Sequence, residues 1–281
     1  MMRRQRRLPR LLTLAALLGV AVVFFFPLYY LLATSLKTKA DLFASEPTLV
    51  PQDPTLAAYG SVLFGRNMVT LLGNSIVVGL VSTILALIIA FAICYPITRL
   101  PTSRRTRAGV LNWALSLRFL APIAVVIPYF SIVRTIGLYN QLPALILVYT
   151  IFNLPLSIWM LKGFLAEIPL ETEEAALVDG ASRWQAFRHV LLPLSRIGVL
   201  AAGIIVLAFD WAEFQFALIL TATPQAQTFP VGVSGLVTQF EIIWNEMAAA
   251  AVIAIAIPLM LMIIARRHVM TGLTFGIIRE K

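Results

Sequence analysis

Apolar residues dominate six long stretches of the chain, and shorter stretches between them hold most of the charged residues. Each stretch can cross the roughly 30 Å core of a bilayer as a helix of about 20 residues. Strands are disfavoured because the unpaired backbone N–H and C=O groups of an open sheet edge find no hydrogen-bond partners in lipid. The pattern predicts a single all-α polytopic membrane domain over residues 1–281, with spans at 11–34, 71–97, 109–133, 142–163, 195–220 and 247–265.

Composition supports the membrane class, because 60% of the 281 residues are hydrophobic and only 12% are charged. A soluble domain of this length could not bury so much apolar surface. The basic tail before residue 11 suggests a signal peptide, but the apolar run after it is too long, so an uncleaved first span is expected. The net charge of +9 does not predict nucleic-acid binding, because the charges sit at the ends of apolar runs. The one cysteine, Cys94, lies within an apolar run, so no disulfide framework exists.

Lys and Arg are distributed unequally between the two sides. The two tails, the 98–108 loop and the segment around 167–194 hold 17 of them, against four in the opposite loops. The positive-inside rule therefore predicts that both termini are cytoplasmic. It places two long loops, about 35–70 and 221–246, on the outer face.

The polar segment at about 167–194, between the fourth and fifth spans, is typical of two short helices. Glutamates crowd the first turn after residue 170, where negative charge suits the helix dipole. Gly180 can adopt the left-handed conformation that ends a helix. Ser182 and Gln185 have the capping-box spacing that begins another. This segment is predicted to form a helix–turn–helix, which we call the elbow.

The second elbow helix presents Trp184, Phe187 and Leu191 on one apolar face, at positions i, i+3 and i+7. A short helix with two aromatic side chains is typical of one that binds in a partner's groove. The same face would also suit the lipid interface or packing within the protein itself. The sequence leaves these alternatives open.

The elbow also carries the motif E-A-A-x-x-D-G-A, followed by Phe and Pro at fixed distances, which resembles the signature of permease subunits of binding-protein-dependent ABC importers. The likeness extends through 137–169, 211–214 and 272–274, and is greatest to the carbohydrate branch, with the maltose importer's smaller membrane subunit as the nearest type. One departure is Ala212, where that branch often has Asn. The matching elbow residues are Glu174, Ala175, Ala176, Asp179, Gly180, Ala181, Phe187 and Pro193.

The resemblance implies that the elbow is a coupling helix in a cleft of a cytoplasmic ATPase subunit, with Trp184 among its contacts. It implies four kinds of partner: a second homologous permease, a dimer of ATPase subunits, an extracytoplasmic solute-binding protein and a sugar. The nearest approach to a phosphate loop, residues 60–67, has Arg and Asn where Lys and Ser or Thr are needed. The chain is therefore expected to be no enzyme and to bind no cofactor, with ATP and Mg on the partner ATPase.

Ionisable residues within predicted spans point to function. Arg118 lies in the third span, and Asp210 and Glu213 are three residues apart in the fifth, on one predicted helix face. Arg118 could form an ion pair with Asp210 or Glu213. Alternatively, Glu213 with Trp211 and Phe214 lines a sugar path.

Two further polar residues, Asn153 and Tyr149 in the fourth span, are candidates for the same path or for ordinary helix packing. His189 and His268 are isolated and have no metal-ligand spacing, so no metal site is expected. Two carboxylates on one helix do not face each other across a cleft, which disfavours glycoside hydrolysis.

The interpretation that follows is import of a sugar or sugar-like solute by alternating access, in the cytoplasmic membrane of a bacterium or archaeon. A disaccharide, a monosaccharide or polyol, and glycerol phosphate all fit. The alternative, an ion-coupled secondary transporter, would use Asp210 and Glu213 but leaves the elbow unexplained.

Overall fold

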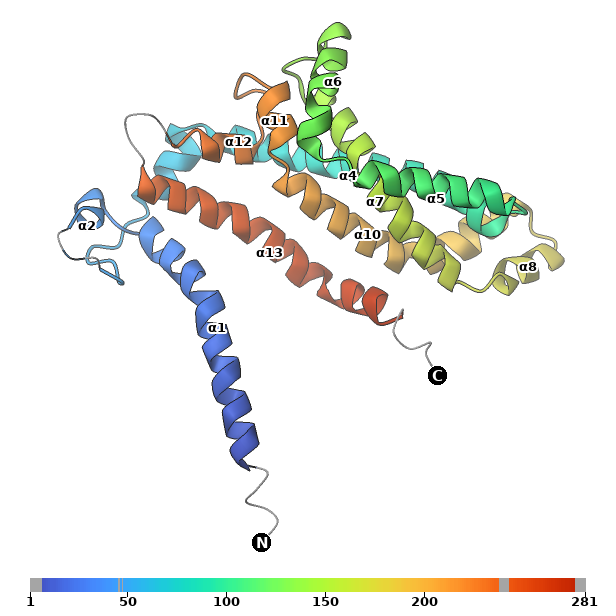
Figure 1. The fold of residues 1–281 in the computed structure, drawn as a ribbon, viewed down its shortest axis with the longest axis horizontal. Coiled ribbons are helices and arrows are strands. Elements are labelled where there is room, and N and C mark those ends of the chain that lie inside the picture. The colour runs from blue at the N-terminus through green and yellow to red at the C-terminus, as the bar shows by residue number, and fades with distance from the viewer. Residues whose placement is uncertain (1–6, 45, 47, 238–242, 276–281) are drawn as a thin grey trace. The chain divides into compact units, whose positions relative to one another are not determined.

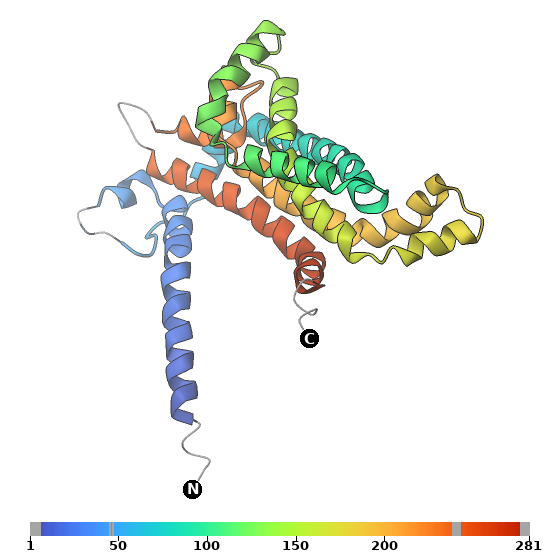
Figure 2. The same ribbon diagram turned by 45° about the vertical axis from the view of Figure 1, so that its right-hand side comes forward.

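The computed structural model describes residues 7–44, 46, 48–237 and 243–275, with side chains described from 13 to 263 within these ranges. The ordered elements of the described chain are helices, as predicted (Figures 1 and 2). They form two compact units. Unit 1 comprises residues 1–68 and 233–256, and unit 2 comprises 69–232 and 257–281.

Unit 1 contains the first predicted span, α1 (Arg7–Ser35), and three short elements of the first outer loop. Charged groups fix this loop: Asp41 is buried and accepts the backbone N–H of Gln52 at 2.9 Å. Glu246, in the first turn of α13, accepts from the Ser61 hydroxyl at 2.6 Å and lies 3.1 Å from Nε of Arg66. The short elements and the last helix are α2 (Lys39–Leu42), α3 (Ala57–Gly60), the π-turn η1 (Ser61–Gly65) and α13 (Trp244–Phe275).

Unit 2 is built on three long helices whose crossings depend on small residues. A side chain on Gly198 would lie 2.5 Å from the ring of Phe164, and one on Gly79 would lie 3.0 Å from Leu207. Two clusters of buried apolar side chains join these helices to the shorter elements of the unit. The helices are α4 (Met68–Arg99), α7 (Leu142–Glu167) and α10 (Leu192–Ala212).

The predicted third span, 109–133, is not one helix. It is divided into α5 (Arg104–Arg118) and α6 (Pro122–Thr135), which meet at 97°. The break precedes Pro122, whose ring disfavours helical geometry at the residue before it, and Ala121 is extended with ψ 137°. The described chain therefore has five helices long and apolar enough to cross a membrane, or six if this bent pair counts as one span.

The predicted fifth span, 195–220, is also interrupted. Helix α10 ends at Ala212 and α11 (Gln215–Leu220) follows after two residues. The second outer loop contains α12 (Phe229–Ser234), and Asn74 donates to its backbone carbonyls at Pro224 and Gln227. The rest of that loop at 238–242, and the last residues of the C-terminal tail, 276–281, lie outside the described residues.

Candidate functional site: the elbow and a buried aspartate

The elbow forms as predicted. Its first helix, α8 (Glu171–Val178), ends in a turn in which Gly180 has φ 89°. The N–H of Ala181 donates to the Ala176 carbonyl at 3.0 Å, and the N–H of Gly180 to that of Leu177 at 3.1 Å. This pair of bonds is the Schellman motif, which satisfies helix carbonyls that would otherwise lack partners.

The second elbow helix begins with the predicted capping box. The N–H of Gln185 donates to the Ser182 hydroxyl at 3.3 Å, and the Ser182 N–H donates to the Gln185 side chain at 2.7 Å. The helix continues through a π-turn into α10, so Pro193 lies in the first turn of that span, two residues after the π-turn ends and not at a free helix start. The elements are α9 (Arg183–Ala186) and the π-turn η2 (Phe187–Leu191).

Most motif residues of α8 and of the turn after it are exposed. Glu174, Ala175, Asp179 and Gly180 are exposed, and Val178 is 87% exposed, which is unusual for an apolar residue outside a lipid-facing surface. Ala176 and Ala181 are half-buried and line a recess of about 380 Å³ beside these exposed residues.

The apolar face of the second helix packs mainly on its own protein, one of the three possibilities left open by the sequence. Phe187 packs edge-on against Phe91 and Tyr95 of α4, with ring centroids 5.7 and 5.4 Å apart, and Leu191 is buried. Trp184 stacks on Phe187 and remains 64% exposed. Of the three, Trp184 is therefore the one that remains available to a partner.

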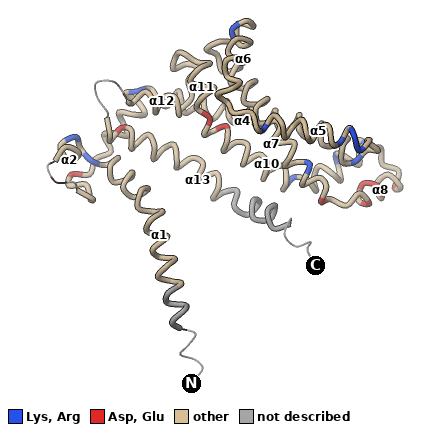
Figure 3. Tube along the Cα trace, viewed as in Figure 1, with Lys and Arg blue, Asp and Glu red and all other residues tan. Residues whose placement is uncertain are grey.

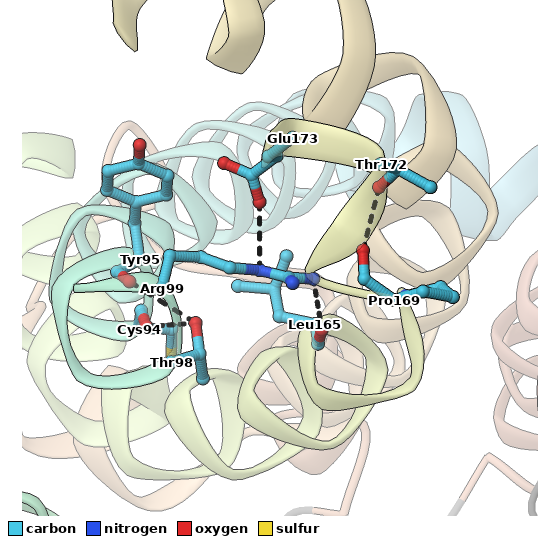
Figure 4. Close-up of polar contacts among 8 residues, drawn as sticks. All are labelled: Cys94, Tyr95, Thr98, Arg99, Leu165, Pro169, Thr172 and Glu173. Atoms are coloured by element: carbon cyan, nitrogen blue, oxygen red, sulfur yellow. Dashed lines mark hydrogen bonds and ion pairs between the residues drawn. The ribbon is translucent and has the colours of Figure 1, made fainter. Parts of the chain in front are cut away.

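One contact of the elbow was not predicted from the sequence. Nε of Arg99, the last residue of α4, lies 3.1 Å from the carboxylate of Glu173, and these side chains are only 4% and 7% exposed (Figure 4). Burial raises the pKa of the Glu173 carboxyl above its usual range, although the nearby charges of Arg99 and Arg183 oppose this shift. Figure 3 shows the acidic residues of α8 together with basic residues at this end of unit 2.

Asp210 lies buried between three helices. Its carboxylate accepts the hydroxyls of Ser82 and Thr83 on α4 at 2.7 and 3.0 Å, and the amide of Asn153 on α7 at 2.6 Å. A buried carboxylate needs such donors. The role of Asn153 in this structure is thus to hold Asp210, and the two residues join α4, α7 and α10.

The predicted ion pair between Arg118 and Asp210 is wrong. The guanidinium of Arg118 lies over the ring of Phe209, 4.7 Å from its centroid, at the C-terminal end of α5. The 97° break places Arg118 in the last turn of α5, and hydroxyl and amide donors occupy the Asp210 carboxylate.

Glu213 does not share a helix face with Asp210, because α10 ends between them. Its carboxylate accepts the N–H groups of Phe216 and Ala217 at 2.9 and 3.3 Å and so caps α11. Trp211 and Tyr149 are buried, and Phe214 is half-buried beside the break between the two helices. Among the described residues, no group of three His, Cys, Asp or Glu side chains could hold a metal ion.

The long apolar helices and the helix–turn–helix elbow together define a membrane-embedded transport subunit. The same fold occurs in the crystal structure of a bacterial ABC transporter involved in the import of the acidic polysaccharide alginate. One of its chains matches with a TM-score of 0.75 and 21% identity over 95% of this chain and 98% of that one.

The chain belongs to the family of binding-protein-dependent transport system inner membrane components, whose model matches residues 15–274. It is a permease subunit of an ABC importer, not a catalytic subunit. It is 36% identical to the sulfoquinovosyl glycerol transport system permease protein SmoH of Agrobacterium fabrum, over 89% of this chain and 87% of that protein. It is also 36% identical to the trehalose transport system permease protein SugB of Mycobacterium tuberculosis, over 94% and 96%.

Proposed function

We propose that this chain carries a sugar or sugar-like solute inward across the cytoplasmic membrane, driven by ATP hydrolysis on a separate subunit. The observation that carries the coupling mechanism is the exposed face of α8, including Glu174, Ala175 and Val178, on an elbow fixed by two capping motifs. The named relatives support a glycoside as solute, since one is named for a sulfoquinovosyl glycerol and another for trehalose.

The partners in this proposal are a second homologous permease, a dimer of ABC ATPase subunits that binds ATP and Mg, and an extracytoplasmic binding protein. The elbow and both termini face the cytoplasm. Glu213, Trp211 and Phe214, at the break between α10 and α11, line the solute path. These residue types suit a sugar, because carboxylates accept hydrogen bonds from hydroxyls and aromatic faces pack on sugar rings.

Crosslinking tests the docking surface. In a Cys94→Ala background, Ala175→Cys is expected to crosslink to the ATPase, since Ala175 is exposed on the motif face. Ala186→Cys is the matched control, because Ala186 is an alanine of the same elbow that is only 2% exposed. Equal labelling of both positions, or of neither, contradicts the proposed surface.

Transport tests the function. The purified complex in proteoliposomes should take up solute only with ATP inside and binding protein outside, and vanadate should stop uptake. Uptake driven by an ion gradient without an ATPase would instead identify a secondary transporter. Thermal-shift screening of the cognate binding protein against sugars, polyols and glycerol phosphate identifies the solute, and Glu213→Gln should reduce its uptake without loss of assembly.

A further inference from the structure

The ion pair between Arg99 and Glu173 joins three helices at one point. The guanidinium that contacts Glu173 on α8 also donates, through Nη2, to the carbonyl of Leu165 in the last turn of α7, at 2.6 Å (Figure 4). The Leu165 carbonyl also accepts the N–H of Ile168 at 3.3 Å, so the arginine supplies a second and shorter bond at the end of α7. The guanidinium makes both contacts at once, a hydrogen bond to Leu165 and an ion pair to Glu173, whereas a lysine ammonium is a point charge on a flexible stem.

Two cavities lie beside this buried pair. Arg99 lines both, of about 500 and 400 Å³, and their walls come from α8, the ends of α4 and α7, and the start of α5. The second elbow helix is attached differently, through the aromatic contacts of Phe187 and the buried Leu191. The direct connection of α8 to α4 and α7 is therefore made by the ion pair of Glu173 and the hydrogen bond to Leu165, and its connection to α10 by packing on the second elbow helix.

The location of the pair relative to the exposed motif gives it a mechanical consequence. Glu173 directly precedes Glu174 and lies about 100° from it around the axis of α8. The Glu173 side chain is buried against Arg99 of α4, whereas Glu174 is exposed. A movement of the exposed side of α8 can therefore reach α4 and α7 through this buried contact, beside the packing of α8 on the second elbow helix.

We propose that Arg99 and Glu173 are positioning residues that transmit movements of α8 to α4 and α7 during transport. The inference rests on the proposed function, in which an ATPase moves the elbow. It adds a specific contact within this chain through which that movement passes.

The test compares solute uptake with ATP hydrolysis for the complete complex in proteoliposomes. Glu173→Gln keeps the size of the side chain but removes its charge, and is expected to lower solute transported per ATP by about 2- to 30-fold. Arg99→Lys keeps the charge but not the fork, and is expected to lie between this variant and wild type. Glu171→Gln is the control, since Glu171 is exposed on the same helix two residues earlier and should leave the ratio unchanged.

A second variant separates positioning from stability. Replacing both charges by apolar residues, Arg99→Met with Glu173→Leu, often leaves the stability of a protein with a buried ion pair unchanged. We expect this complex to melt at the wild-type temperature, retain its ATPase and hydrolyse ATP, yet transport less solute per ATP.

Wild-type transport per ATP in either Glu173→Gln or the double variant would overturn the inference. That result differs from a failure of the proposed function, in which the wild-type complex itself would contain no ATPase or would transport without ATP.

Discussion

Removing the Asp210 carboxylate should destabilise unit 2 measurably. In Asp210→Ala, the hydroxyl of Thr83 and the amide of Asn153 lose the acceptor that joins their helices to α10. Ser82 is affected less, because its hydroxyl also lies within 2.6 Å of the Val78 carbonyl on its own helix.

The expected loss follows from the number of contacts. Interhelical hydrogen bonds in membrane proteins contribute about 0.6 kcal/mol on average and at most about 1.7 kcal/mol, so the three contacts sum to about 2 kcal/mol, with an upper bound near 5 kcal/mol. Replacing Asn153 lowers the unfolding free energy less. Its amide oxygen is buried without a hydrogen-bond partner among the described atoms, and the replacement removes this unfavourable group. Asn153→Ala should therefore cost less than Asp210→Ala.

SDS titration of the complex in detergent micelles measures these differences in unfolding free energy. Asp179→Ala is the control, because Asp179 is an exposed aspartate on the elbow and should cost little. A double-mutant cycle between Asp210 and Asn153 should give a coupling energy of about 0.6–1.7 kcal/mol. An Asp210→Ala complex as stable as the control, together with zero coupling, would refute the assignment of Asp210 as a contact that joins the helices.

Three further perturbations have defined outcomes. Gly198→Ala should lower the unfolding free energy by about 1–3 kcal/mol through overlap with Phe164, whereas Gly163→Ala, with open space at its Cβ, should not; equal melting temperatures would contradict this. Gly180→Ala forces a side chain into φ 89° and should cost about 1–2 kcal/mol, seen as weaker retention of the ATPase on purification. The raised pKa of Glu173 means that its carboxylate is protonated at a higher pH than that of an ordinary glutamate. Acidification to a pH where an ordinary glutamate is still charged should therefore lower transport per ATP. The Glu173→Gln variant should show no such decrease.

The elbow was predictable from sequence because its signals are local. The capping box of Ser182 and Gln185 and the left-handed Gly180 act within a few residues, and all were found where the sequence placed them. The long spans were predictable for a related reason, since hydrophobic length alone decides whether a helix can cross a bilayer.

The breaks within spans were missed because hydrophobic length does not report backbone geometry. A proline such as Pro122 favours a kink, but its place within an apolar run does not indicate a break of 97° between two helices. At the end of α10, no residue in the sequence marks Glu213 as a cap for α11 rather than as a neighbour of Asp210. Polar groups buried in a membrane form hydrogen bonds with nearby partners, and for the Glu213 carboxylate these partners are backbone N–H groups.

The pairing of Arg99 with Glu173 depends on three-dimensional proximity, and no spacing rule links residues so far apart in the chain. Its importance emerges from the position of α4, which carries Arg99 at its end and Ser82 and Thr83 near its middle. About 25 Å of helix separates these two polar contacts, at 1.5 Å per residue. One contact binds α4 to the elbow, and the other binds it to Asp210 on α10. A displacement of the elbow that tilts α4 therefore also strains the hydrogen bonds that α4 makes with Asp210. A continuous helix fixed by polar contacts at both places is the kind of physical connection that coupling between distant sites requires.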